Sequence, residues 1–250
     1  FGCGFNITPM WHPLRLAEDF ATVDLLTKGR VIFGVGRGYH SREVDTYGAP
    51  STNTDSDANR DLFEEQVEVI LKAFNNQSFS HHGKIYDLPP KGLPYRGYEL
   101  EEITMVPRPV NRPVECWQPI VSAGQRAMDF MAKHGIKGIV GGGAAATMAA
   151  FECAEAGVRV IQATKGRATS GTTTVARGGF AAAMGKDDSP EQHLAEVLEH
   201  GGELINPELA AVWTADIVEV VNDMRRWGAE FILDDNGELD LKIFPGHSHA

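Results

Sequence analysis

A glycine-rich bend between two apolar segments constrains the fold of this 250-residue chain more than any other feature. The stretch GIVGGGAAATMAAFECAEAGVRVIQATKG predicts a strand at 136–140, a turn, a helix and a second strand at 158–163. The spacing Gly141-x-Gly143-x-x-Ala146 matches the dinucleotide-binding fingerprint, in which alanine is allowed as the third small residue. Two interpretations remain open: a turn that binds phosphate, and a corner whose small residues only permit close packing.

The phosphate interpretation gives each small residue a task. Gly141 permits the tight turn, Gly143 lets the backbone approach a pyrophosphate, and Ala146 lets the helix pack near the strand. The start of the helix offers unpaired N–H groups and partial positive charge to an anion. Against this interpretation, the second strand ends without the Asp or Glu that usually accepts hydrogen bonds from a ribose hydroxyl.

Composition limits the classes of function. The chain carries 34 acidic and 23 basic residues, a formal charge of −11, which argues against nucleic-acid binding. Cys3, Cys116 and Cys153 are odd in number and lack metal-ligand spacing, so we expect no disulfide framework, no metal site and a cytoplasmic location. We expect no membrane span, because no apolar run reaches the ~18–20 residues required. The chain opens at Phe1 inside an apolar segment, so we expect a further part upstream.

Helix and strand signals alternate along the first half. Pro13 opens an amphipathic helix, and RVIFGVG predicts a buried strand at 31–35. Apolar spacing over 63–74 predicts another helix, and WQPIVSAG predicts a further strand and turn. Between them, residues 75–115 hold many proline signals and are interpreted as an inserted excursion. This alternation is typical of α/β folds.

Several motifs of the first half stand in the order typical of one family. They are HPLRLAEDFATVDLLTKGRVIFGVGRGYHSREVDTYGAP at 12–50, FEEQVEVILKAF at 63–74, FSHHGKIYDLPP at 79–90 and WQPIVSAGQRAMDFMAKHGIKGIVGGG at 117–143. On these motifs, residues 1–140 resemble the luciferase-like, flavin-dependent monooxygenases, a TIM-barrel family that uses FMN or a deazaflavin.

In a barrel of this type, functional groups lie at the carboxyl ends of the strands. The resemblance implies that the GVGRGY and SAG turns touch the flavin and its phosphate, since an arginine offers a fork of donors and SAG precedes a helix. Alternatively, the glycines of GVGRGY only relieve crowding at the barrel rim. The residues implied are Arg37, Gly38, Ser122 and Gly124.

The second half carries motifs of a different family. They are GGGAAA at 141–146, ATKG at 163–166, SGTTTVARGGFAAAMG at 170–185, DDSPEQHLAEVLEHGGELINPEL, and RRWGAEFILDDNGELDLKIFPGHSHA. On these, residues 141–250 resemble the flavoprotein subunit family of fumarate reductase, succinate dehydrogenase and L-aspartate oxidase. In that family a Ser/Thr-Lys pair commonly replaces the acidic residue after the second strand, and Thr164-Lys165 fits this pattern.

This second resemblance implies FAD. The pyrophosphate would lie at the glycine bend, and the ribityl and isoalloxazine part along the SGTTT and RGG segments. The implied contact residues are Gly141, Gly143, Ala144, Ala145, Ala146, Thr164, Lys165, Ser170, Gly171, Thr172, Gly178 and Gly179.

The sequence departs from the flavoprotein subunit family in two ways that bear on the FAD assignment, and it contains several histidines whose roles must be considered. Some relatives carry a histidine bonded covalently to the flavin where Gly171 stands here, so we expect non-covalent FAD. The chain ends before the family's capping domain and catalytic residues, and His247 and His249 are interpreted as loop histidines. In the first half, His12 faces the flavin or caps a helix, and the pair at 81–82 is interpreted as a solvated turn.

The sequence therefore predicts an α/β chain of two parts: a partial TIM-barrel (luciferase-like) segment at 1–140, and a partial Rossmann-like FAD-binding segment at 136–250. We expect a join of two unrelated folds at the shared GGGAAA tract. A natural fusion, a recombination and an assembly error all remain open as its origin. Both parts lack strands that would complete their folds, so the open edges make stable folding doubtful.

Three functional hypotheses follow. The leading one is a flavin-dependent oxidoreductase fragment whose second half binds FAD non-covalently, with a small-molecule substrate and an electron-transfer partner. The second is a luciferase-like monooxygenase that uses FMN or a deazaflavin, to which the second half contributes nothing. The third is a catalytically silent flavin-binding module or a non-functional chimera.

Overall fold

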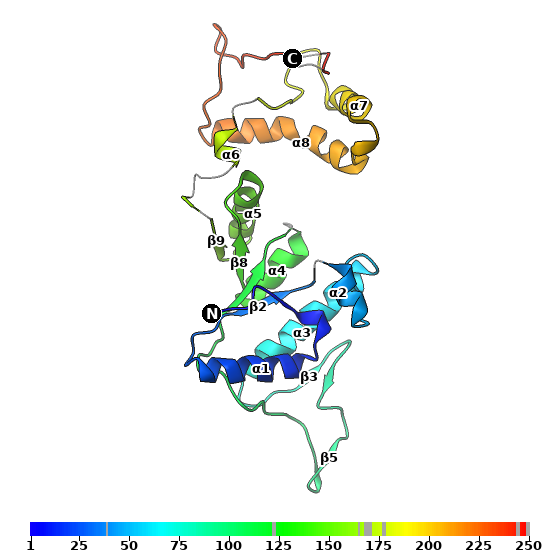
Figure 1. Ribbon diagram of the computed structural model, residues 1–250, viewed down its shortest axis with the longest axis vertical. Coiled ribbons are helices and arrows are strands. Elements are labelled where there is room, and N and C mark those ends of the chain that lie inside the picture. The colour runs from blue at the N-terminus through cyan, green and yellow to red at the C-terminus, as the bar shows by residue number, and fades with distance from the viewer. Residues whose placement is uncertain are drawn as a thin grey trace. The chain divides into compact units, whose positions relative to one another are not determined.

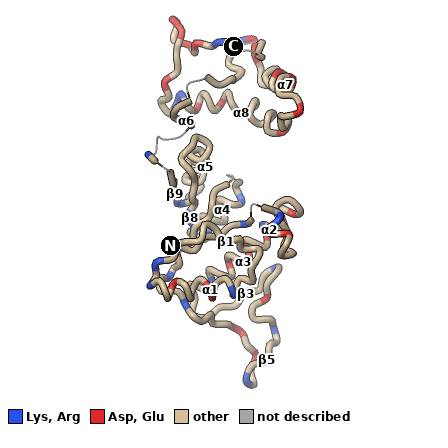
Figure 2. Tube along the Cα trace, in the orientation of Figure 1, with Lys and Arg blue, Asp and Glu red and all other residues tan. Residues whose placement is uncertain are grey.

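The computed structural model describes residues 1–38, 40–121, 124–164, 166–167, 172–176, 179–243 and 246–248. The chain forms two compact units, Phe1–Ala176 and Arg177–Ala250, and each is described by itself. The expected join at 136–146 therefore lies inside the first unit (Figure 1). Acidic residues occur in both units, in keeping with the net charge (Figure 2).

A five-stranded parallel sheet organises the first unit. Its strands follow one another in the order β1-β2-β7-β8-β9, and every neighbouring pair is parallel. Successive strands therefore lie side by side, which is the winding found in a (β/α) barrel. The expected α/β class with a parallel sheet is confirmed, while barrel closure and a Rossmann-like second segment remain predictions. The strands are β1 (Asn6–Ile7), β2 (Phe33–Gly36), β7 (Cys116–Pro119), β8 (Lys137–Val140) and β9 (Val160–Gln162).

One helix lies in the connection between each pair of neighbouring strands, with a short additional helix after β2. Pro13 stands at the first position of α1, as expected from its missing N–H. Gly135 ends α4 with φ 65°, in the left-handed region that glycine adopts at low cost. The helices are α1 (Pro13–Leu26), α2 (Ser41–Thr46), α3 (Ser56–Asn75), α4 (Gln125–His134) and α5 (Ala144–Glu155), with a 3-10 helix at Thr8–Met10.

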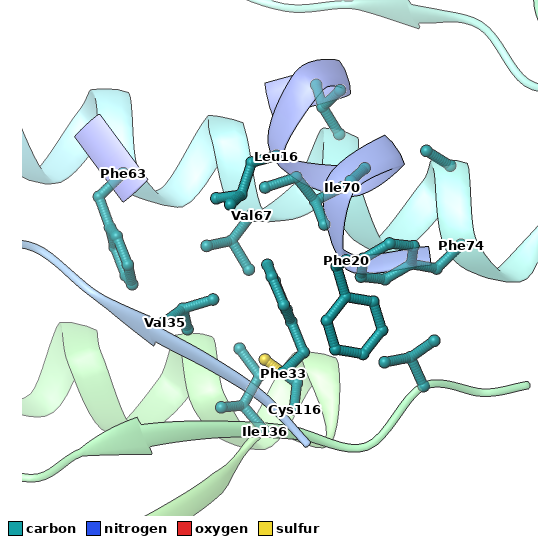
Figure 3. Packing of buried hydrophobic residues seen from close by; sticks show 14 of the residues in the cluster. Leu16, Phe20, Phe33, Val35, Phe63, Val67, Ile70, Phe74, Cys116 and Ile136 are labelled. Carbon is teal, nitrogen blue, oxygen red and sulfur yellow. The ribbon is translucent and has the colours of Figure 1, made fainter. Parts of the chain in front are cut away.

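The core of the first unit lies between the sheet and its helices (Figure 3). Phe20 of α1, Phe33 of β2 and Phe74 of α3 contact one another with ring centroids 4.9 to 5.2 Å apart. Cys116 lies against this cluster, and burial raises the pKa of its thiol to about 12. Burial of such aromatic side chains contributes ~1.5–3 kcal/mol each and stabilises the packing of the sheet against α1 and α3.

The excursion between α3 and β7 is ordered by two hairpins. They are β3 (His81–His82) with β4 (Asp87–Leu88), and β5 (Pro94–Tyr95) with β6 (Tyr98–Glu99). The Glu65 carboxylate of α3 accepts hydrogen bonds from the backbone N–H groups of Lys84, Ile85 and Tyr86. Glu65 thus binds three successive backbone N–H groups of the hairpin turn, and Gln66 and Asp61 of the same helix add bonds to Tyr86 and Lys84.

The second unit consists of two packed helices and irregular segments. Ser189 caps α7 by accepting a hydrogen bond from the N–H of Gln192, as the capping signal predicts. Asn206 caps α8 in the same way. The expected turn at 234–237 joins a short antiparallel bridge between Leu233 and Leu239. The helices of this unit are α7 (Pro190–Gly201) and α8 (Pro207–Arg226), joined by a 3-10 helix at Gly202–Leu204.

Candidate functional site

The bend after β8 leads into the start of α5. Gly143 is the N-cap residue, with φ −83° and ψ 172°, and no side chain of its own caps the helix. β9 lies beside β8 in parallel register, so strand, bend, helix and strand form the expected β-α-β unit. The bend is open rather than walled off, because Gly141, Gly143 and Ala144 are all exposed. Free N–H groups at a helix start suit a phosphate oxygen.

The three glycines of the bend differ in whether internal packing requires the absence of a side chain. A Cβ on Gly142 would run into the side chain of Thr164, so packing alone demands glycine there. A Cβ on Gly141 would come no closer than 3.9 Å to Ala146, and one on Gly143 no closer than 3.9 Å to Thr173. Internal packing therefore leaves Gly141 and Gly143 unexplained. Their open space fits a group that approaches the backbone from outside, as a flavin pyrophosphate would.

A short helix, α6 (Thr172–Val175), brings a hydroxyl to this helix start. The Oγ1 atom of Thr173 accepts a hydrogen bond from the N–H of Ala144 at 3.3 Å. Behind the bend, Gln162 donates to the Thr147 hydroxyl at 2.8 Å, which ties the end of β9 to α5. Sequence reasoning missed Thr173 and Gly142 as parts of the site. The TTT run after the glycine fingerprint was the only signal for the former.

Several predicted FAD contacts receive no structural description. Lys165, Ser170, Gly171 and Gly178 lie outside the described residues, and so does Ser122 of the first half. The side chain of Thr172 is likewise not described. Gly179 belongs to the second unit. The structure therefore brings together 141–146, Thr164 and α6, and these assignments remain proposals.

The predicted contact residues after β2, Arg37 and Gly38, have structural roles within the first unit. Arg37 donates from Nε to Asn59 at 2.9 Å and from Nη2 to the carbonyl of Ser56 at 2.7 Å, so it anchors the start of α3. Burial, followed by the neighbouring Arg60, lowers the pKa of Arg37. Gly38 has φ +89°, and a Cβ there would clash with Val44, so the backbone itself requires glycine.

A second helix start lies at the same edge of the sheet. Gly124 is the N-cap of α4 with φ −70°, and nothing within 4 Å would meet a Cβ on it. β7 and β8 are parallel neighbours, so the turn before α4 and the bend before α5 both follow carboxyl ends of adjacent strands. Two candidate phosphate positions are therefore present in the first unit, at Gly124 and at Gly141–Gly143.

The histidines of the first half differ in burial, and His81 departs from its expected exposure to solvent. His81 is buried rather than solvated, and its Nε2 lies 3.1 Å from Glu65, so the expectation of a solvated turn at 81–82 is wrong for this residue. His82 is exposed and pairs with Asp87. His12 stands at the N-cap of α1 without a side-chain cap, and its ring packs edge-on against Tyr86 at 5.6 Å.

In the second unit, His247 is half-buried and its Nδ1 atom lies 3.1 Å from Glu196. His249 falls outside the described residues. Hydrogen bonds from Ser248 and, to a lesser extent, from His247 hold the pKa of Glu196 at about 2. None of the helices in the described ranges combines the length and apolar character that crossing a bilayer requires.

The model of the luciferase-like monooxygenase family matches residues 1–230. The chain belongs to this family. The match continues past Val140, where the sequence predicted a change of fold, and includes the bend, α5 and β9. A luciferase-like relative, the oxygenase component of the flavin-dependent trigonelline monooxygenase of Acinetobacter baylyi, is 26% identical over 112 residues, 45% of this chain and 27% of the relative.

The luciferase-like chain also shares sequence with the second predicted family. The L-aspartate oxidase of Streptomyces coelicolor is 37% identical over 109 residues, 44% of this chain and 19% of that enzyme. One similar solved structure is the oxygenating constituent of 3,6-diketocamphane monooxygenase from Pseudomonas putida in complex with FMN. It aligns with a TM-score of 0.47 at 17% identity, over 91% of this chain and 57% of that chain. The chain thus spans only about a fifth to a quarter of the curated relatives named here.

Proposed function

We propose that this luciferase-like chain is a flavin-dependent oxidoreductase that binds FAD non-covalently, with the diphosphate at the bend 141–146. One observation carries the proposal: Gly141 and Gly143 leave open space beside a helix start whose N-cap residue has no capping side chain, and no internal contact requires glycine at either position. The resemblance of residues 141–250 to the flavoprotein subunit family supports FAD, because the glycine bend is one of the motifs that carry this resemblance.

The residues of the bend would hold the diphosphate through the backbone. The N–H groups at the start of α5 donate to phosphate oxygens, and the helix dipole favours their negative charge. The Thr173 hydroxyl, which accepts from Ala144, has its own proton left to donate to the same anion. Bound FAD supplies hydride or electron transfer, and the chain supplies binding and orientation. A small-molecule substrate and an electron-transfer partner belong to this proposal.

A second candidate is an FMN or deazaflavin monooxygenase with its phosphate at the start of α4. The family match over 1–230 and the sequential order of the parallel strands favour it. In this case Gly124 and Ser122 would hold the phosphate, with Arg37 and Gly38 at the next strand end. The relative named an oxygenase component suggests a separate reductase as the partner.

A matched pair of substitutions separates the two candidates. Both Gly143→Val and Gly124→Val place a side chain in open space at a helix N-cap with negative φ, so both should fold. The full chain and the two variants are purified, freed of flavin, and titrated with FAD or FMN, with flavin fluorescence as the signal. We expect Gly143→Val to weaken FAD binding at least about tenfold, the effect of losing ~1.4 kcal/mol, and Gly124→Val to leave it unchanged.

The reverse pattern, loss of FMN binding in Gly124→Val alone, would establish the second candidate instead. Absence of binding of either flavin to the unsubstituted chain, with circular dichroism showing a folded protein, would reject both candidates and leave the non-functional chimera. Thermal unfolding of each variant verifies that any loss arises at the site rather than from unfolding.

A further inference from the structure

A cavity of about 430 Å³ in the second unit contains a buried histidine without hydrogen-bond partners. His193 of α7 is only 2% exposed, and neither ring nitrogen finds a partner among the described residues. Its ring packs edge-on against Trp213 at 5.0 Å and His247 at 5.3 Å, which fixes its orientation. Unpaired buried polar atoms cost ~1–3 kcal/mol each, so such a group needs an explanation.

The imidazole of His193 is held neutral. Burial lowers its pKa, and the neighbouring His247 lowers it further, while Asp188 and Glu196 act in the opposite direction. A neutral imidazole has one nitrogen that donates and one that accepts. The accepting nitrogen lacks a partner among the described residues and belongs to a side chain that lines the cavity, so the N–H group of a ligand would supply its missing hydrogen bond.

The charged residues around the cavity favour a cation. Lys242 and Asp240 both line the cavity and form an ion pair at 3.4 Å. The charge of this lysine therefore neutralises the charge of Asp240. Asp188 and Glu230 also line it, and neither forms an ion pair with any other described residue. Figure 2 shows acidic residues along the segment that follows α8, to which Glu230 belongs. Two negative charges therefore remain for a ligand to neutralise.

The rest of the wall is apolar and partly aromatic. Phe180 and Phe231 pack edge-on with ring centroids 6.3 Å apart, and Met184, Val221 and Leu239 complete this side. Such a wall buries a flat hydrocarbon body, and aromatic faces attract a cation directly. A mostly apolar cavity with few convergent polar groups is the usual form of a small-molecule site.

We propose that this cavity binds an aromatic amine in its protonated form. The ammonium group donates to the free nitrogen of His193 and lies near Asp188 and Glu230, and the ring lies against Phe180 and Phe231. This site lies entirely within the second unit and does not depend on the glycine bend.

Three probes that share one ring test the charge preference by calorimetry on the full chain. Tryptamine carries an ammonium group, tryptophol a neutral hydroxyl, and indole-3-propionate a carboxylate. We expect tryptamine to bind at least tenfold more tightly than tryptophol, and indole-3-propionate not to bind. Equal affinities, a preference for the anion, or no binding of any probe would overturn the proposal.

Substitutions test the named residues. His193→Phe keeps the ring contacts with Trp213 and His247 but removes the accepting nitrogen, and we expect a tenfold or greater loss of tryptamine affinity. Glu230→Gln should weaken binding three- to tenfold, whereas the control Glu203→Gln, on an exposed residue outside the cavity, should not. Unchanged affinity in folded His193→Phe and Glu230→Gln would contradict the assignment.

The Gly143→Val variant keeps the two proposals separate. Tryptamine affinity should be the same in this variant as in the unsubstituted chain, whatever happens to flavin binding. Tryptamine binding without flavin binding would reject the proposed function alone, and flavin binding without tryptamine binding would reject the amine site alone.

Discussion

The hydroxyl of Thr173 accepts a hydrogen bond from the backbone N–H of Ala144, at 3.3 Å, across 29 residues of chain. This contact joins the SGTTT segment to the start of α5, which were identified as separate motifs in the sequence. A hydroxyl that accepts from the helix start can still donate its own proton outward. The N–H group of Ala144 is taken by this bond, so the donor that the pair offers to an anion is the Thr173 hydroxyl.

Replacing Thr173 with valine tests whether this hydroxyl takes part in phosphate binding. Valine keeps the shape and removes one hydrogen bond to a charged group, which contributes ~1.5–3 kcal/mol. We expect FAD affinity to fall about tenfold or more, measured by fluorescence titration. The control Thr22→Val removes an exposed hydroxyl of α1 that bonds to Glu18, and should leave FAD affinity unchanged. Equal affinities in both variants would remove Thr173 from the site.

Alanine at Gly142 and at Gly141 should have different effects on stability. Gly142→Ala drives a methyl group into Thr164, so we expect the free energy of unfolding to fall by ~1–3 kcal/mol. Gly141→Ala meets only Ala146 at 3.9 Å and should leave stability nearly unchanged. Denaturant unfolding measures both. Adding Thr164→Ser to Gly142→Ala removes the clashing methyl group and should restore stability; no restoration would refute the packing argument.

Removing the Glu65 carboxylate should release the β3–β4 hairpin. Burial acts to raise the pKa of Glu65, but hydrogen bonds from the N–H groups of Tyr86 and Ile85, and one from His81, outweigh it and lower the pKa. Glu65→Ala leaves these donors unpaired, so we expect a loss of ~3 kcal/mol in the free energy of unfolding. Limited proteolysis should then cut between His81 and Leu88.

Glu68 provides the control for this substitution, because it lies one turn further along α3. It binds Lys133 and His134 through partly exposed side chains, so Glu68→Ala should cost no more than ~1 kcal/mol. Equal protease resistance of the hairpin in Glu65→Ala and Glu68→Ala would show that Glu65 does not hold the hairpin.

Acid should weaken the second unit through His193. Its pKa is lowered in the folded chain, mainly by burial, from the ordinary value of 6.5. As pH falls below about 6.5 the unfolded chain takes up a proton that the folded chain refuses, so stability decreases until the folded pKa is reached. Above pH 6.5 this residue contributes no pH dependence. Denaturant unfolding of the full chain at pH 7.5 and 5.5 measures the difference.

His193→Phe should have a smaller loss of stability between these two pH values, because it carries no titratable group at this position. His134 of α4, whose pKa is also lowered mainly by burial, keeps its own contribution in the variant. His200→Phe makes the same replacement at an exposed residue of the same helix and gives the control for adding a phenylalanine to α7. An unchanged pH dependence in His193→Phe would contradict this account.

Local signals predicted the elements around the bend well. The strand before Gly141, the helix after Gly143 and the parallel second strand all occur within three residues of their expected bounds. Ser189 and Asn206 cap α7 and α8, because capping depends on residues close together in the chain. Helix α2 and the early start of α3 at Ser56 were missed, since the polar residues of that stretch carry no apolar period.

Long-range contacts explain the remaining differences. Nothing near Gly142 in the sequence indicates that Thr164 lies against it, and nothing near His81 indicates burial beside Glu65. Gly38 illustrates the same limit, because a positive φ and the nearby Val44 require glycine there for reasons independent of any ligand. A glycine pattern therefore predicts a turn more reliably than it predicts what the turn binds.

The most direct measurement of the central claim is the identity and amount of flavin released from the purified full chain. The protein is loaded with an equimolar mixture of FAD and FMN and is freed of unbound flavin by gel filtration. It is then denatured, and the released flavin is quantified by liquid chromatography with absorbance detection. We predict close to one FAD per chain and little FMN, with FAD lost in Gly143→Val. FMN alone in the released fraction, or full FAD content in Gly143→Val, would contradict a diphosphate bound at this bend.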